Sequence, residues 1–244
     1  MTEPHPDHTA RPVSADPPAV SPLDVDPQFR AAVVDLIAVL AIGELTAFER
    51  LAEDAKFAPT LSDKAVLAAM AAAEFGHFAL LRDRLAELGV DPNTAMEPFV
   101  PALTEFHERT APSDWLEGLV KAYVGDGIAT DFYREVAAHV DPRTRDLVHQ
   151  VLADTGGAEF VVETVREAIA ADQKVAGRLA LWGRRLMGEA LSQAQRVAAE
   201  RDTLSALLVG GAELRGFDLA EIGRMFTRLT ENHTKRMAAL GLAA

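Results

Sequence analysis

Four stretches of the chain carry an acidic residue in the middle of an otherwise apolar helical stripe. Residues three and four apart lie on one face of a helix, and an apolar face of this kind packs into a protein core. Glu44, Glu74, Asp126 and Glu159 occupy such positions, and His77 lies one turn beyond Glu74 on the same face. An unpaired carboxylate in an apolar interior is strongly destabilising or takes up a proton. Four of them at one level of a bundle therefore need a common partner.

A pair of divalent metal ions would be such a partner. Carboxylate oxygens and imidazole nitrogen suit iron or manganese, and helical bundles build these sites in their cores. Glu44 and Glu74 lie 30 residues apart, and Asp126 and Glu159 lie 33 apart, so each helical hairpin presents its two acids at a similar depth. We predict a metal site formed by Glu44, Glu74, His77, Asp126 and Glu159.

The elements that must position these residues are helices. Aromatic residues make up only 6% of the chain, and runs with strict two-residue alternation are absent, so sheets are not expected. The pattern predicts helices over about 28–56, 60–89, 113–140, 141–171, 173–205 and 218–240, with a proline-rich loop between the second and third. Thr60, Ser113, Asp141 and Asp218 are the expected N-terminal caps. Two long hairpins joined by a long crossover favour an all-α, ferritin-like four-helix bundle with two additional C-terminal helices. A helical repeat array is the alternative, although no repeat is seen.

The chain divides into three parts by composition. Residues 1–27 hold seven of the thirteen prolines, and we expect a disordered tail. The bundle would span residues 28–171, with a helical pair over 172–244 packed on it. The tail resembles neither a secretory signal nor a transit peptide, so a cytoplasmic location is expected.

Composition also sets aside several classes of protein. The chain has no cysteine and so no thiolate site. Its net charge of −13 argues against a general nucleic-acid surface, although residues 172–244 carry a net charge of +3. No apolar run long enough to span a membrane is expected, so we predict a soluble protein without a membrane partner. Phosphate loops, nucleophile elbows and zinc-protease motifs are absent.

The candidate ligands also carry a family resemblance. Glu44, the Glu74-Phe75-Gly76-His77 motif, the Gly125-Asp126-Gly127 segment and Glu159 resemble the ferritin-like di-iron carboxylate superfamily. The branch they resemble most is related to the tRNA 2-methylthio-isopentenyl-adenosine hydroxylases, and the likeness covers about residues 28–171. It implies a cytoplasmic non-haem di-iron oxidoreductase that uses O₂ to hydroxylate an organic substrate, in that branch a modified tRNA base. Glu74 and Glu159 would then bridge two iron ions, with Glu44 and Asp126 as terminal ligands and His77 as a nitrogen ligand.

The chain departs from this family at one ligand. The family has a second Glu-x-x-His, but here Val162 follows Glu159 by three residues, which leaves the second iron position without its histidine. Glu163 is a candidate substitute. Two alternatives therefore stay open: a metal-binding ferritin-like protein without hydroxylase activity, and a bundle whose degenerate metal site serves a structural or interaction role. Met225, Phe226, Leu229 and Met237 are interpreted as core or as the seam of a homodimer.

Overall fold

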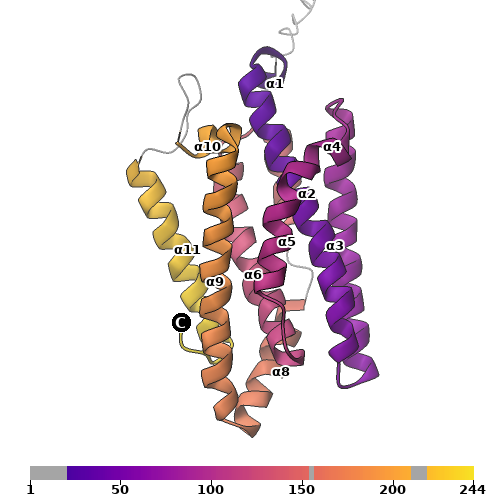
Figure 1. The fold of residues 1–244 in the computed structure, drawn as a ribbon, viewed down its shortest axis with the longest axis vertical. Coiled ribbons are helices and arrows are strands. Elements are labelled where there is room, and N and C mark those ends of the chain that lie inside the picture. The colour runs from indigo at the N-terminus through magenta and orange to yellow at the C-terminus, as the bar shows by residue number, and fades with distance from the viewer. Residues whose placement is uncertain (1–20, 154–156, 210–218) are drawn as a thin grey trace, which may run out of the picture.

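The computed structural model describes residues 21–153, 157–209 and 219–244, and these residues form helices and no strand (Figure 1). The expected all-α bundle is confirmed. The helices are α1 (Pro22–Val25), α2 (Pro27–Asp54), α3 (Leu61–Glu87), α4 (Pro92–Met96), α5 (Val100–Arg109), α6 (Trp115–Ala137), α7 (Pro142–Val151), α8 (Gly157–Ala171), α9 (Lys174–Glu200), α10 (Asp202–Val209) and α11 (Leu219–Ala239). Short 3₁₀ turns follow α2 (Ala55–Phe57) and α4 (Glu97–Phe99).

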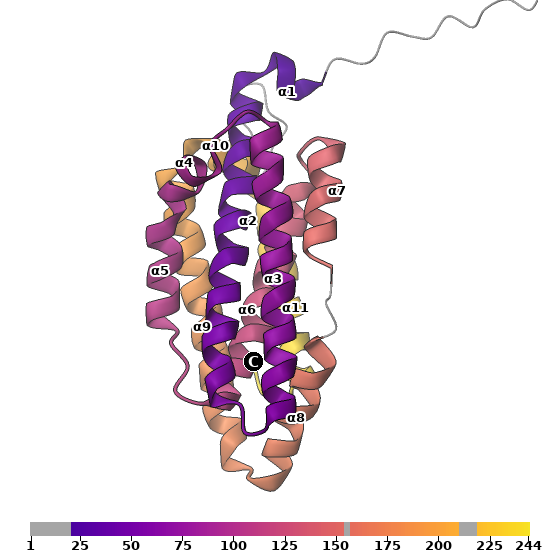
Figure 2. The same cartoon turned by 90° about the vertical axis from the view of Figure 1, so that its right-hand side faces the viewer.

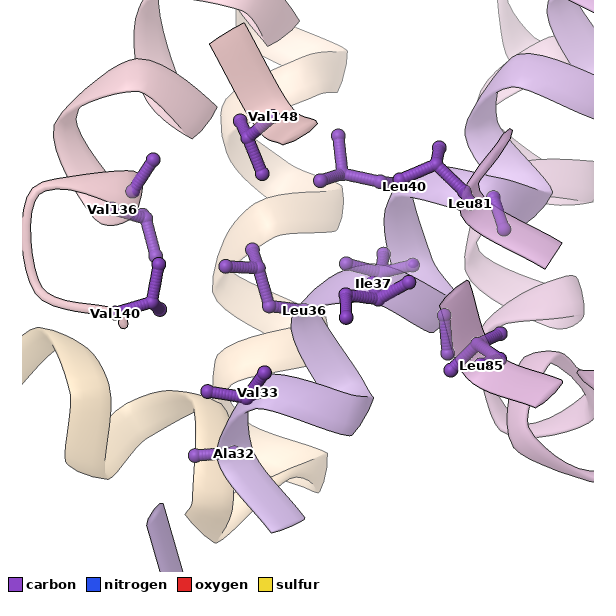
Figure 3. Close-up of a cluster of buried hydrophobic side chains, with 14 of the residues drawn as sticks. Ala32, Val33, Leu36, Ile37, Leu40, Leu81, Leu85, Val136, Val140 and Val148 are labelled. Atoms are coloured by element: carbon purple, nitrogen blue, oxygen red, sulfur yellow. The ribbon is translucent and has the colours of Figure 1, made fainter. Parts of the chain in front are cut away.

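Helix α2 lies in the interior and has apolar side chains on more than one face. Figure 3 shows its side chains pointing in two directions, toward Leu81 and Leu85 of α3 on one side and toward Val136, Val140 and Val148 on the other. The α2 residues in this cluster include Ala32, Val33, Leu36, Ile37 and Leu40, each at most 2% exposed. A helix that is apolar nearly all round is stable only when it is enclosed. The rest of the bundle is therefore built around α2.

A second core joins α6 to the C-terminal helices. Leu119, Val120 and Val124 of α6 are fully buried with Leu179 and Leu186 of α9. The indole Nε1 of Trp182 donates a hydrogen bond of 2.9 Å to the carbonyl of Glu117, which ties α9 to α6. The predicted boundary between residues 171 and 172 falls at the end of α8, within this continuous core.

Two of the expected N-terminal caps are confirmed, and one is wrong. Thr60 accepts from the backbone N–H of Asp63 at 3.1 Å, and Asp141 accepts from that of Thr144 at 3.1 Å. Asp114, not Ser113, caps α6 by accepting from the N–H of Glu117. The Ser113 hydroxyl instead donates to the Glu117 carboxylate at 2.6 Å. Asp218 lies outside the described residues.

Three stretches differ from the predicted helix pattern. The expected proline-rich loop contains α4 and α5, because its prolines stand in the first turns of helices, where no N–H is needed. The predicted helix over 141–171 is two helices, α7 and α8, which lie at different heights along the bundle (Figure 2). The predicted helix over 173–205 is divided at Arg201, whose backbone is extended.

The last part of the predicted disordered tail is ordered, because residues 22–25 form α1 and α2 begins at residue 27. Residues 1–20 lie outside the described part of the chain, whereas α1 and the first residue of α2 fall within the predicted tail. The Ser21 hydroxyl caps α1 by accepting from the N–H of Leu23, and the Leu23 side chain joins the core.

In the described part of the chain, two helices are long and apolar enough to cross a membrane, contrary to expectation. The segment Pro27–Phe57 has a mean hydropathy of 2.0 and is 61% buried over its most apolar window. Helix α3 has a mean hydropathy of 1.4 and is 22% buried over its window. Core helices of soluble proteins pass the same test, so length and composition alone are weak grounds for a membrane span.

Candidate metal centre

Three of the predicted ligands converge between α2 and α3. Glu44 comes from the middle of α2, and Glu74 and His77 come from α3, one turn apart. The Nδ1 atom of His77 lies 3.5 Å from a carboxylate oxygen of Glu44 and 3.4 Å from one of Glu74. One donor atom from each residue lies within 4.8 Å of the others. The side chains are only 12%, 14% and 17% exposed, so water competes weakly for these atoms.

When no metal is bound, protons on Glu44 and His77 reduce the repulsion between the two carboxyl groups of this cluster. Burial raises the pKa of Glu44 to about 9, and the neighbouring Glu74 carboxylate adds to the effect. Hydrogen bonds to Glu44 and Glu74 raise the pKa of His77 to about 10, against the effect of burial. Burial opposes the ionisation of Glu74, but hydrogen bonds with His77 and Glu44 lower its pKa overall. At neutral pH the cluster is therefore a protonated Glu44, a carboxylate Glu74 and an imidazolium His77.

The donor set fits a divalent metal ion of intermediate hardness. Two carboxylates and one imidazole are ligands that iron and manganese accept, and all three must be deprotonated to bind. The crowding that holds extra protons on Glu44 and His77 is what a cation would relieve. His77 offers Nδ1 toward the two carboxylates, so that atom is the one placed to bind.

The cluster lines a cavity of about 390 Å³ between α2, α3, α5, α6 and α8. This is the size of cavity that encloses one small organic molecule. Much of its wall is apolar and comes from Leu40, Leu51, Met70, Leu103, Phe106 and Val161.

The other two predicted ligands stand apart from the cluster. Asp126 lines the same cavity, but it is an exposed residue of α6 with interactions of its own. Glu159 is exposed in the first turn of α8 and is not part of the cavity wall. The α8 face that packs inward carries Gly157, Val161 and Val165, and Glu159 lies two positions from this stripe. The break between α7 and α8 changed the register from which an inward Glu159 was predicted.

Sequence reasoning missed several polar residues of the cavity. Asp54, Lys121 and His107 of α5 all line it. Asp54 and Lys121 are buried. Lys121 could have been recognised, because it lies three residues before the apolar Val124, on the same face of the helix. Tyr133 was not missed, because its helical spacing from Asp126 marks it as a possible donor to a ligand; it lines the cavity, and burial raises its pKa well above the ordinary value, helped by the nearby Glu44. Its phenol therefore keeps its proton at all physiological pH values.

Comparison with known proteins supports the bundle and identifies the family. A solved structure titled "Protein 19 with aldehyde deformylating oxidase activity", from Synechococcus, superposes with a TM-score of 0.68 at 17% sequence identity. The match covers 90% of this chain and 94% of that chain, and at this identity it shows a common fold. No curated protein matches the chain. A family model described as "Ferritin-like domain, actinomycetes" matches residues 27–211. The chain belongs to this ferritin-like domain family.

Proposed function

We propose that this protein is a non-haem iron or manganese oxidase that activates O₂ and oxidises a small organic substrate within its cavity. The observation that carries the proposal is the opening of the Glu44, Glu74 and His77 cluster onto an apolar-walled cavity of about 390 Å³. A site for storing iron does not need an apolar chamber beside it. An enzyme that oxidises an organic molecule does.

The family and the fold likeness support this class of chemistry. The Synechococcus protein of similar fold has aldehyde deformylating oxidase activity. In our proposal, Glu44, Glu74 and His77 hold the metal ion. The bound metal supplies the binding of O₂ and the transfer of electrons to it. The apolar walls exclude water, and the protonated Oη of Tyr133 lies in the same cavity as a proton donor.

We propose that one metal position fills before any second. The described residues bring together three ligand side chains, which is enough for one ion with room for other ligands. Asp126 is the acidic residue of the predicted set that lines the same cavity, and we propose it as a ligand of a second ion. Two iron ions per chain remain our proposal for the fully loaded protein, with Glu159 needing a rearrangement of α8 to take part.

We favour a small substrate over a modified tRNA base. Polynucleotide binding depends on lysine and arginine that neutralise phosphates, and the chain carries a net charge of −13. The cavity wall carries five acids, including the two ligand glutamates, and four basic residues (Arg50, Lys121, Arg134 and Arg236), so it has no excess of positive charge for a phosphate.

Metal loading tests the proposal directly. Wild type, Glu74→Ala and the control Glu49→Ala, which removes an exposed acid of α2, would be loaded anaerobically with ferrous iron and freed of excess. We expect Glu74→Ala to lose most of its iron and Glu49→Ala to keep it. On mixing with air, wild type should consume O₂ faster than the same concentration of free ferrous iron. Equal iron in wild type and Glu74→Ala would overturn the site, and O₂ consumption no faster than free iron would overturn the oxidase.

A further inference from the structure

The cavity continues along α2 well past the metal cluster. Its α2 wall runs from Leu40 through Glu44 to Asp54. Ten residues separate Glu44 from Asp54, which at about 1.5 Å per residue is roughly 15 Å. The cavity therefore has a second polar group of residues, Asp54, His107 and Lys121, which we call the far end.

Lys121 is a buried ammonium group at the far end. It is 6% exposed, and its Nζ donates a hydrogen bond of 2.8 Å to the carbonyl of Thr110. Nζ also lies 5.6 Å from the centre of the Phe106 ring. A lysine ammonium has three N–H donors, and the Thr110 carbonyl is its one hydrogen-bond acceptor among the described residues. Two donors are thus free to meet a molecule in the cavity.

Asp54 and His107 complete the far end. Asp54 is 8% exposed and attracts Lys121 electrostatically. The Nδ1 atom of His107 is buried without a hydrogen-bond partner in the described part of the chain. Burial lowers the pKa of His107 to about 3, helped by Lys121 and Arg50, so this imidazole is neutral at pH 7. A buried polar atom without a partner is destabilising, and a ligand oxygen or amide would relieve it.

The local charges decide what kind of ligand fits. The Lys121 ammonium and the Asp54 carboxylate balance each other, His107 is neutral, and Arg50 is paired with Glu53 at 2.8 Å. A carboxylate ligand would be repelled by Asp54, and an ammonium ligand would be repelled by Lys121. A hydroxyl or a primary amide can accept from Lys121 and donate to Asp54 at once. Besides the polar Thr46 and Arg50, the cavity wall has an apolar surface that includes Leu51, Leu103 and Met70.

We propose that the far end binds the hydroxyl or carboxamide end of an aliphatic molecule, whose apolar chain extends toward Glu44, Glu74 and His77. The far end would thereby select an uncharged, amphipathic substrate and hold its polar end away from the metal. Its role in selecting a substrate rests on the proposed function, but the binding itself needs no metal.

Calorimetric titration of the metal-free, full-length protein tests this. The probes are octan-1-ol, which both accepts and donates, and octanoate, which has a chain of the same length and a negative charge. We expect octan-1-ol to bind wild type more tightly than octanoate does. Lys121→Met, which keeps the side chain's length, should weaken octan-1-ol binding about tenfold, as expected for a lost hydrogen bond to a charged group. The control Lys64→Met, at an exposed lysine of α3, should leave it unchanged.

A second variant keeps the test decisive if Lys121→Met fails to fold by circular dichroism. Asp54→Asn removes the negative charge with little change of shape, so octanoate binding should rise about tenfold while octan-1-ol binding changes little. A purely structural Asp54 would produce no such reversal of preference. Tighter binding of octanoate than of octan-1-ol by wild type, equal octan-1-ol binding by folded Lys121→Met, or no binding of octan-1-ol at all would each overturn the proposal. Because no metal is present, these results are independent of whether Glu74→Ala loses iron.

Discussion

Glu44 is held in a state that it would not adopt in water. Its pKa is raised from 4.5 to about 9, so between these pH values the folded protein binds a proton that the unfolded chain has lost. The free energy of unfolding of the metal-free protein must therefore fall as pH rises through this window. The carboxylate would be retained for a ligand and not for the stability of the apoprotein.

Glu44→Gln should consequently be at least as stable as wild type when both are metal-free. The amide cannot ionise, so the advantage of Glu44→Gln should grow by about 1 kcal/mol for each pH unit between pH 5 and pH 8. Urea unfolding at the two pH values measures it, with Glu49→Gln as the control at an exposed glutamate of α2. A Glu44→Gln variant that is clearly less stable at pH 8 would mean that Glu44 is a structural hydrogen-bonding residue.

Val162 stands where the family has its second histidine. Its surroundings determine whether the substitution Val162→His can add a metal ligand. Val162 is half-buried on α8, whereas Glu159 of the same helix is exposed. A histidine at 162 would therefore have no inward glutamate beside it. We expect Val162→His alone to leave the iron content of the anaerobically loaded protein unchanged, as measured by metal analysis. A higher iron content than that of wild type, loaded in the same way, would show that α8 turns to bring Glu159 inward.

The α2–α3 hairpin is the element in which sequence and structure agree on the site. Glu74 and His77 are related by local helix spacing, and one short turn sets the register of Glu44 against them, so period and caps were sufficient to predict this cluster. Asp126 and Glu159 depend on how α6 and α8 are rotated and on where the α7–α8 break falls. No local pattern encodes those quantities, which arise from packing among distant helices. The same dependence explains why α4 and α5 were expected to be a loop.

Asp35 of α2 binds Arg201 and Thr203 at the start of α10. The contribution of this contact to stability can be measured by mutation. This buried carboxylate of α2 accepts from the Nε and Nη2 atoms of Arg201, at 3.1 and 2.6 Å, and from the hydroxyl of Thr203. Asp35→Ala leaves both donors without their acceptor, and we expect a loss of about 2 kcal/mol in the free energy of unfolding. Urea denaturation measures the loss.

The matched control is Asp35→Ala in an Arg201→Ala background. If Asp35 and Arg201 stabilise the protein mainly through their contact with each other, Asp35→Ala should lower the free energy of unfolding distinctly less in the Arg201→Ala background than in wild type. Equal losses in both backgrounds would assign the effect to Asp35 alone.

At the scale of the whole molecule, both hydrophobic cores depend on helices that are distant in sequence. The all-α class and the bundle were predictable because long periodic stretches have one low-energy way to bury their apolar faces. The share of the core contributed by α9 was not predictable, since Leu179, Trp182 and Leu186 show only that some face is buried.

A chain ending at Ala171 should therefore fail to form the bundle. It would lack α9, α10 and α11, exposing Leu119 and Val124 of α6 and leaving Asp35 unpaired. We expect helical circular dichroism without a cooperative thermal transition, together with strong binding of a hydrophobic dye. A sharp melting transition for this shortened chain would contradict the shared core.

The contact between Asp35 and Arg201 also has a consequence for how the protein is made. The two residues are 166 positions apart, so α2 leaves the ribosome long before the helix that covers its first half has been translated. At about 5–20 residues per second, that interval lasts on the order of ten seconds. During this interval α3 to α7 can already pack on α2, but the part of α2 that contacts α10 stays uncovered. Binding of the nascent chain by a holding chaperone, or slow translation, would protect this apolar surface of α2 until α10 packs on it.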